Sequence, residues 1–164
     1  MRGEKCMAIR SIRTEGDEIL KKKSKKVEVI DEKVIELIKD MIETLHKYDG
    51  VGLAAVQVGI LKQIVVIQEE KDKPIYILIN PEIISQSGKQ IVEEGCLSFP
   101  NKFAKIERPE KIKIRALNEK GEKIEITAKG LLAQAISHEI DHLNGEVFID
   151  KIIPGTLEYV EPEN

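Results

Sequence analysis

Two histidines and a glutamate near the C-terminal end of the sequence have the spacing of a metal site. His138, Glu139 and His142 form the pattern His-Glu-x-x-His. On a helix, residues four apart project from the same face, so both imidazoles can bind one ion. The glutamate then lies near the same ion, where its carboxylate can take a proton from a water molecule that the metal activates. These residues predict a metal-dependent hydrolase.

A catalytic ion of this type needs a third protein ligand and an open position for water. One protease class places a histidine six residues after the second motif histidine, but Phe148 occupies that position here. Cys96 offers a soft thiolate, which suits zinc or iron(II) beside two imidazoles, and is favoured. A glutamate from the C-terminal tail is the alternative, and the candidates are Glu158, Glu161 and Glu163. Neither Cys6, near the N-terminus, nor His46, which lacks ligand spacing, is expected to bind the ion.

The elements that must position these residues follow from the periodicity of apolar side chains. Helical spacing runs from Asp31, a candidate N-cap, to a stop at Asp49 and Gly50, which predicts an N-terminal amphipathic helix. Short β-rich or alternating runs predict strands over 64–67, 75–79, 111–115 and 123–127, the last two as a hairpin. Helical spacing returns near Lys129 and ends at Gly145. The predicted fold is an α+β domain with strands gathered around a late helix that carries the motif.

Length and composition indicate one soluble globular domain. The chain has 164 residues, of which 41% are hydrophobic and 34% charged, and a net charge of −3. This composition excludes a disordered chain and gives no basic excess for a specific nucleic-acid partner. No apolar stretch approaches the roughly 20 residues that span a bilayer, so no membrane partner is expected and the cytoplasm is the expected compartment. The expected organisation is a leader over 1–6, a single catalytic domain over 7–152 and a short tail over 153–164.

Three motifs, taken together, resemble those of the peptide deformylase family. They are Gly50-Val51-Gly52-Leu53-Ala54-Ala55-Val56-Gln57, Glu94-Gly95-Cys96-Leu97-Ser98 and His138-Glu139-Ile140-Asp141-His142-Leu143-Asn144-Gly145. They occur in the family's order with similar separations, and the general similarity extends from Met7 to Ile152. The resemblance implies a small α+β fold in which antiparallel β-sheets pack around the motif helix.

The resemblance also implies the metal and the reaction. The site would bind one divalent ion through Cys96, His138 and His142. Iron(II) is the usual physiological ion of the family, and zinc, nickel or cobalt can replace it. Glu139 would be the acid and base in removing the formyl group from the N-terminal formyl-methionine of newly synthesised polypeptides, with release of formate. Gln57 and the Leu97 N–H would donate hydrogen bonds to the oxyanion that forms.

An apolar pocket is expected to hold the methionine side chain, and by motif position its wall should include Val51, Val92, Leu97, Leu131 and Ala135. The resemblance also implies a wider set of substrate-binding residues. They are Gly50, Val51, Gly52, Val92, Glu94, Gly95, Leu131 and Ala135. Three residues depart from the family's commonest pattern and put the shape of this pocket in question: Val56, Gln134 and Ser137. The expected partners are N-formyl-methionyl nascent peptides, with a transient contact to the ribosome. The alternative function is a small metallopeptidase that uses the same His-Glu-x-x-His motif.

Overall fold

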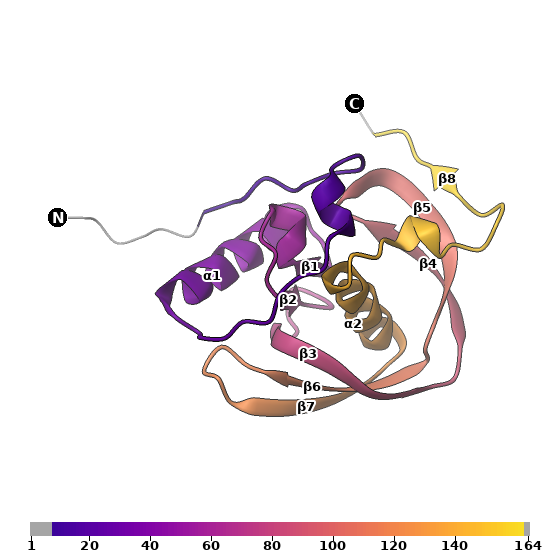
Figure 1. Ribbon diagram of the computed structural model, residues 1–164. Coiled ribbons are helices and arrows are strands. Elements are labelled where there is room, and N and C mark those ends of the chain that lie inside the picture. Colours follow the sequence, from indigo (N-terminus) through magenta and orange to yellow (C-terminus); the bar gives the residue numbers. More distant parts are fainter. Residues whose placement is uncertain (1–7, 163–164) are drawn as a thin grey trace.

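Two helices and two β-sheets make up the part of the chain that the structure, a computed structural model, describes (Figure 1). The described residues are 8–162, so the predicted leader with Cys6, and Glu163, lie outside them. The helices are α1 (Glu32–Lys47) and α2 (Gly130–Leu143). Three short 3-10 helices are η1 (Glu18–Lys21), η2 (Ala55–Val58) and η3 (Phe148–Asp150).

All pairings between the named strands of residues 8–162 are antiparallel. One sheet has five strands in the order β1-β2-β3-β6-β7, and the other has three in the order β4-β5-β8. The strands are β1 (Gly52–Ala54), β2 (Ile64–Ile67), β3 (Tyr76–Ser87), β4 (Gln90–Cys96), β5 (Phe99–Arg108), β6 (Lys111–Leu117), β7 (Lys123–Lys129) and β8 (Glu158–Tyr159). Strands β1 and β4 are edge strands of their sheets. The predicted α+β class with antiparallel sheets around a late helix is confirmed.

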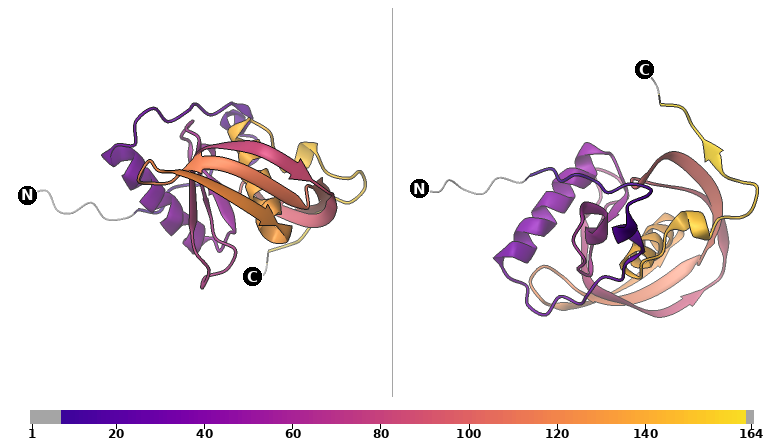
Figure 2. Two further views of the ribbon diagram at one scale, coloured as in Figure 1. Left: turned by 90° about the horizontal axis from the view of Figure 1, so that it is seen from below. Right: turned by 45° about the horizontal axis from the view of Figure 1, so that its top comes forward.

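The uninterrupted apolar sequence of β2 reflects helices on both faces of its sheet. Val65 and Ile67 pack in a cluster with α2, whereas Ile64 and Val66 pack in a second cluster with α1. Successive side chains of a strand point to opposite faces, so a strand covered on both faces has no position for a polar residue. Figure 2 shows α1 and α2 on opposite sides of these strands.

Helix α1 begins at a side-chain cap and buries one face. The carboxylate of Asp31 accepts a hydrogen bond of 3.0 Å from the N–H of Val34, which satisfies one of the free donors of the first turn. Its buried apolar residues are Val34, Leu37, Ile38, Met41 and Leu45. Helix α2 is buried on most sides because both sheets contact it. Within residues 8–162, no helix is long and apolar enough to cross a membrane.

The predicted hairpin is present and forms the β6–β7 pair. Lys111 pairs with Lys129 at its open end, and Ile114 pairs with Ile126 near its middle. The loop is held by the Asn118 side chain, whose Oδ1 accepts from the backbone N–H of Glu122 at 3.0 Å. Because all of these contacts are local in sequence, alternation and turn residues are sufficient to predict the hairpin.

Strand β3 is longer than its apolar run predicts. The prediction covers 75–79, whereas the strand continues to Ser87. Its pairing with β6 contains two register shifts, between Ile79 and Glu82 and between Ile83 and Ser85. Such irregularities break the alternation of inward and outward side chains, so the second half of the strand has no readable period.

Candidate metal centre and active site

Helix α2 and the end of β4 bring three possible metal ligands together. His138 and His142 lie one turn apart on α2, and Cys96 is the last residue of β4. Their ligand atoms all lie within 4.8 Å of one another, and Cys96 Sγ is 3.3 Å from His142 Nε2. One sulfur and two imidazole nitrogens form a donor set that suits iron(II) or zinc. The residues therefore fit a divalent ion.

The other candidate ligands lie elsewhere. Glu158 and Glu161 are exposed and are not part of the group formed by Cys96 and the two motif histidines. His46, near the C-terminal end of α1, places its Nε2 2.7 Å from Gln68 Oε1. Its contact supports the loop after β2, in agreement with a structural role.

A buried carboxylate fixes the orientation of the first motif histidine. Glu94 Oε2 lies 2.6 Å from His138 Nδ1, which leaves Nε2 of that ring for the metal site. Carboxylates in this position set the tautomer of a ligating histidine and raise its basicity. Burial alone would raise the pKa of Glu94, but hydrogen bonds from His138 and Arg108 lower it to about 2.

Arg108 and Asp141 extend the hydrogen-bond network of Glu94 and His138, and the sequence analysis did not assign either of them a role at the site. The Arg108 guanidinium binds both oxygens of Glu94, at 3.0 and 2.6 Å, and donates to Asp141 Oδ2 at 2.6 Å. Its side chain is only 3% exposed. The sequence does contain a signal: Arg108 continues the inward alternation of Ala104 and Ile106 in β5. A charged residue in phase with buried positions requires a buried partner.

Glu139 is buried beside the ligands and against the backbone of β1. A Cβ added at Gly52 would lie 2.6 Å from Glu139 Oε2, so only glycine permits this approach. Glu139 Oε1 has no hydrogen-bond partner among residues 8–162, and a buried carboxylate oxygen needs one. Burial raises the pKa of Glu139 to about 7, although the nearby His138 opposes the shift. The carboxyl group can therefore exchange protons near neutral pH.

The two motif histidines differ in their affinity for a proton. Burial would lower the pKa of His138, but Glu139, the Cys96 sulfur and Glu94 raise it well above its usual range. Burial and the proximity of His138 lower the pKa of His142 well below its usual range. In the metal-free site a positive charge is thus favoured on His138 and disfavoured on His142.

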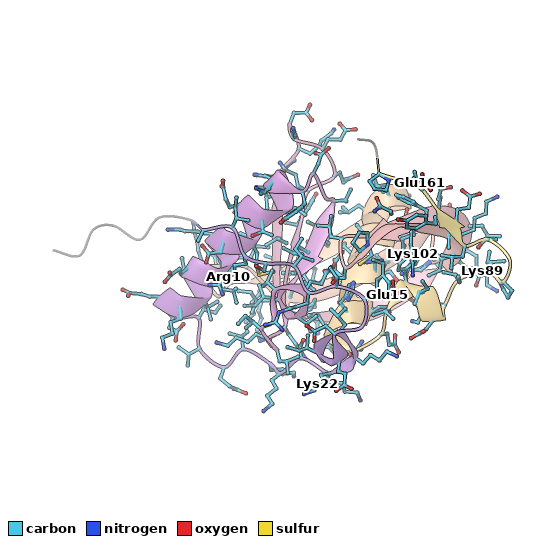
Figure 3. All side chains as sticks on the ribbon, turned by 90° about the horizontal axis from the view of Figure 1, so that it is seen from above. Arg10, Glu15, Lys22, Lys89, Lys102 and Glu161 are labelled. Carbon is cyan, nitrogen blue, oxygen red and sulfur yellow. The ribbon has the colours of Figure 1, made fainter. Side chains whose placement is uncertain are left out.

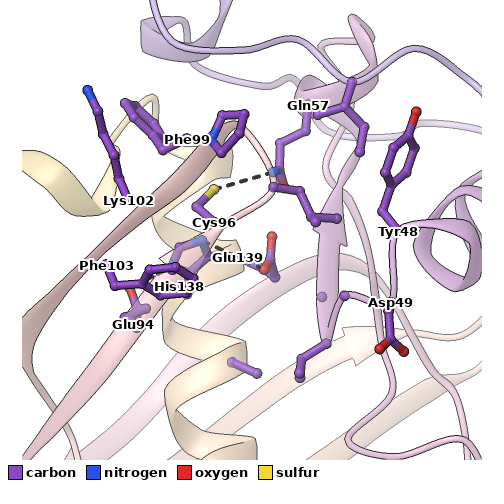
Figure 4. A pocket seen from close by; sticks show the side chains of 18 of the residues that line it. Tyr48, Asp49, Gln57, Glu94, Cys96, Phe99, Lys102, Phe103, His138 and Glu139 are labelled. Carbon is purple, nitrogen blue, oxygen red and sulfur yellow. Dashed lines mark hydrogen bonds and ion pairs between the residues drawn. The ribbon is translucent and has the colours of Figure 1, made fainter. Parts of the chain in front are cut away.

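Hydrogen bonds give the side-chain amide of Gln57 a defined orientation beside Cys96. Its Oε1 accepts a hydrogen bond of 2.9 Å from the N–H of Ala54. The Nε2 group consequently faces Ser98 Oγ at 3.1 Å. It also faces Cys96 Sγ at 3.6 Å, the contact that is dashed in Figure 4. Leu97, between Cys96 and Ser98, lies in the turn that follows β4. The amide donor contacts Cys96, and the turn with Leu97 follows Cys96 directly in the chain.

A cavity of about 680 Å³ opens onto these residues. Of the predicted substrate-binding residues, it is lined by Gly50, Val51, Gly52, Glu94, Gly95, Leu131 and Ala135. Val92 is not among the lining residues of this cavity, and its role stays a prediction: it lies opposite Ile106 in the β4–β5 pair and packs into the neighbouring apolar cluster. Lining residues that were not predicted include Tyr48, Asp49, Lys102 and Phe103.

Gln134 lines the cavity where an apolar residue is usual in the family. Its Nε2 donates to Glu93 O at 3.2 Å and to Glu94 Oε1 at 3.4 Å. Both amide hydrogens of Gln134 are therefore bonded within the protein, which reduces the polarity that this side chain presents to a ligand. The other two departures, Val56 and Ser137, are buried and do not line the cavity.

The chain is similar to known proteins over nearly its whole length. The family model described as Polypeptide deformylase matches residues 9–157. Peptide deformylase 1 of Clostridium acetobutylicum is 58% identical over 146 residues, which cover 89% of this chain and 96% of that protein. The crystal structure of a peptide deformylase from Legionella pneumophila has a TM-score of 0.86 at 44% identity, covering 90% of this chain and 88% of that one. The crystal structure of the peptide deformylase from Ehrlichia chaffeensis in complex with actinonin also has a TM-score of 0.86, at 42% identity, and the match covers 90% of this chain and 91% of that one.

These matches favour a deformylase over the alternative prediction of a small metallopeptidase with the same motif. The family model and the relatives both cover the three motifs together, and not the His-Glu-x-x-His helix alone. The chain therefore belongs to the polypeptide deformylase family, whose activity is the hydrolytic removal of the N-formyl group from new polypeptides.

Proposed function

We propose that Cys96, His138 and His142 hold one divalent ion, iron(II) under physiological conditions, and that Glu139 moves the protons during deformylation of formyl-methionyl peptides. The observation that carries this proposal is the convergence of the three ligand atoms within 4.8 Å of one another. Zinc, nickel and cobalt suit the same donors and are expected to substitute. When bound, the ion supplies Lewis acidity, which lowers the pKa of water and polarises the formyl carbonyl.

Glu139 is placed to act first as a base and then as an acid. It takes a proton from the water that adds to the formyl carbon, and it returns a proton to the amine nitrogen when the carbon–nitrogen bond breaks. The products are formate and a free methionyl amine. Two features support this role: the pKa of about 7 and the Oε1 atom that has no partner in the described structure.

Gln57 and the Leu97 N–H are the proposed donors to the oxyanion. Addition of water leaves negative charge on the former carbonyl oxygen, and fixed donors stabilise this charge more than the neutral carbonyl. The hydrogen bond from Ala54 N–H to Gln57 Oε1 supports the assignment, because it turns the donor end of the amide toward the Cys96 side of the cavity.

The substrate backbone is proposed to lie as an extended strand between β1 and β4. Both strands are edges of their sheets, and residues of both line the cavity. A free edge offers N–H and C=O groups that an extended peptide can pair with. The methionine side chain then enters the part of the cavity lined by Val51, Leu131 and Ala135, where apolar contact favours its thioether chain.

The substrate also indicates the compartment and the partner. Formylated nascent chains occur where bacterial ribosomes translate, so we propose that the enzyme acts in the cytoplasm and contacts the ribosome transiently. The bacterial relatives support this setting.

The test is formate release from formyl-Met-Ala-Ser by anaerobically purified protein, with metal analysis of the same sample. The expected result is stoichiometric formate and Met-Ala-Ser with about one ion per chain. Unformylated Met-Ala-Ser is the matched control and should remain intact. Cleavage of the Met–Ala bond, or metal-loaded protein that releases no formate, would contradict the proposal.

A further inference from the structure

The amide of Gln57 must be held in one orientation to act as a donor. The amide of a glutamine can rotate by half a turn about its last bond, which exchanges the oxygen and the nitrogen. An oxygen facing the oxyanion would repel it, whereas a nitrogen stabilises it. Gln57 is 1% exposed, so protein groups and not bulk water decide its orientation.

Ser98 supplies the contact that holds the nitrogen end. Gln57 Nε2 donates to Ser98 Oγ at 3.1 Å, and Ser98 is fully buried. The amide nitrogen has two hydrogens. One is used by Ser98, and the other is directed to the side of Cys96 Sγ, at the longer distance of 3.6 Å. The short contact thus anchors the amide, and the long one, which is the dashed line between Gln57 and Cys96 in Figure 4, leaves a donor on the side where the substrate carbonyl has to lie.

A single N-terminal segment fixes the backbones of both residues. Arg13 N–H donates to Gln57 O at 2.7 Å, and Glu15 N–H donates to Ser98 O at 2.8 Å. The segment is in turn tied to β5, because Lys102 Nζ lies 2.6 and 2.8 Å from the two oxygens of Glu15. Figure 3 shows Glu15 and Lys102 side by side on this face. The backbones of Ser98 and Gln57 are therefore held in place relative to one another.

We propose that Ser98 is a positioning residue for deformylation: its hydroxyl accepts one amide hydrogen of Gln57 and thereby keeps the other directed at the substrate oxygen. This inference rests on the oxyanion role proposed for Gln57. Ser98 acts through Gln57 alone, so its removal matters only while the glutamine amide is present.

The test is a double-mutant cycle with Ser98→Ala, Gln57→Ala and the combined variant. Ser98→Ala should lower kcat on formyl-Met-Ala-Ser about tenfold, the scale of one neutral hydrogen bond, with KM and metal content changed less than about twofold. In the Gln57→Ala background the same substitution should change kcat less than about twofold. Ser24→Ala is the matched control, because the Ser24 hydroxyl is buried without a partner in the described structure. It should leave kcat unchanged.

A second measurement separates this inference from the proposed function. In the NMR spectrum of the zinc-loaded protein, the two Nε2 hydrogens of Gln57, assigned by their loss in Gln57→Ala, should exchange slowly with solvent. Ser98→Ala should accelerate that exchange, whether or not the protein releases formate. Ser98→Cys, which retains the volume but only a weak acceptor, should shift both readouts in the same direction.

Three results would overturn the proposal. Equal kcat losses from Ser98→Ala in both backgrounds would show that it acts independently of Gln57. Loss of the metal in Ser98→Ala would place its role at Cys96. Unchanged exchange of the Gln57 amide hydrogens would show that the serine does not hold them. A wild-type protein without deformylase activity but with the exchange change would instead contradict only the proposed function.

Discussion

Replacing Glu139 by glutamine should stabilise the metal-free protein above neutral pH while removing most of its activity. The residue is 3% exposed, and its Oε1 has no partner in the described structure. Burial raises the pKa of Glu139 to about 7 from the ordinary 4.5. The ionised carboxylate is therefore unfavourable in the folded protein, and an uncharged amide of the same shape avoids this cost.

The two pKa values define the pH range of the effect. Below pH 4.5 the group is protonated in both the folded and the unfolded chain, so it does not change the free energy of unfolding. Between pH 4.5 and about 7 only the unfolded chain ionises, and stability falls by about 1.4 kcal/mol per pH unit. Above about pH 7 the loss is complete, at roughly 3 kcal/mol.

Urea unfolding of metal-free wild-type and Glu139→Gln proteins, at about pH 5 and about pH 8, measures this difference. The gain from the substitution should be roughly 2–3 kcal/mol larger at the higher pH, and kcat of the metal-loaded variant should be about 10²–10⁴-fold lower. A gain that does not depend on pH would refute the reasoning.

Glu94→Gln is the matched control, and it should change the free energy of unfolding in the opposite direction. Burial alone would raise the pKa of Glu94, but hydrogen bonds from His138 and Arg108 lower it to about 2. The carboxylate then contributes stability that is complete above pH 4.5 and is lost as the pH falls toward 2. Its substitution should therefore destabilise the metal-free protein at both test conditions.

Three further substitutions test the metal ligands, the buried ion pairs and the close approach of β1. Cys96→Ser should lose most metal and activity, measured by metal analysis and formate release, because a weak hard ligand replaces a thiolate; Cys6→Ser, the control, should retain both. Arg108→Met should lower the free energy of urea unfolding by about 3–5 kcal/mol, because it removes the buried cation that Glu94 and Asp141 share, and an unchanged midpoint would contradict this. Gly52→Ala should lower kcat at least about tenfold with metal retained, since the added Cβ would lie 2.6 Å from Glu139 Oε2; full activity would show that the carboxylate can move away.

Apolar periodicity in the sequence predicts those parts of the site that lie within a single helix or hairpin. The expected helix from near Lys129 to Gly145 is α2, which spans Gly130–Leu143 and presents both motif histidines and Glu139. The β6–β7 hairpin is predicted for the same reason, since its pairing depends on neighbours in the sequence. The third ligand is different: Cys96 follows from ligand chemistry and motif resemblance, not from periodicity.

The contacts that support the site are long-range and have no local period. Arg108 is 14 residues from Glu94 and 33 from Asp141, and Gln57 is 41 residues from Ser98. Glu94 and Arg108 meet because β4 and β5 pair, and Arg108 and Asp141 meet because α2 packs against β5. The sequence alone offers the types of the residues but not their pairing, since a charged or polar residue is usually on the surface.

The same charges that hold the ligands in place also explain why the site accepts a cation. Glu94 is compensated by Arg108 through two hydrogen bonds, but Glu139 has no comparable cation and lies 4.0 Å from His138 Nε2. Burial would lower the pKa of His138, but Glu139, the Cys96 sulfur and Glu94 raise it well above its usual range, so in the metal-free protein a proton on His138 supplies the positive charge. A divalent ion held by Cys96, His138 and His142 would supply positive charge in place of this proton. Metal and proton therefore compete for one position, and metal affinity should fall as the pH is lowered.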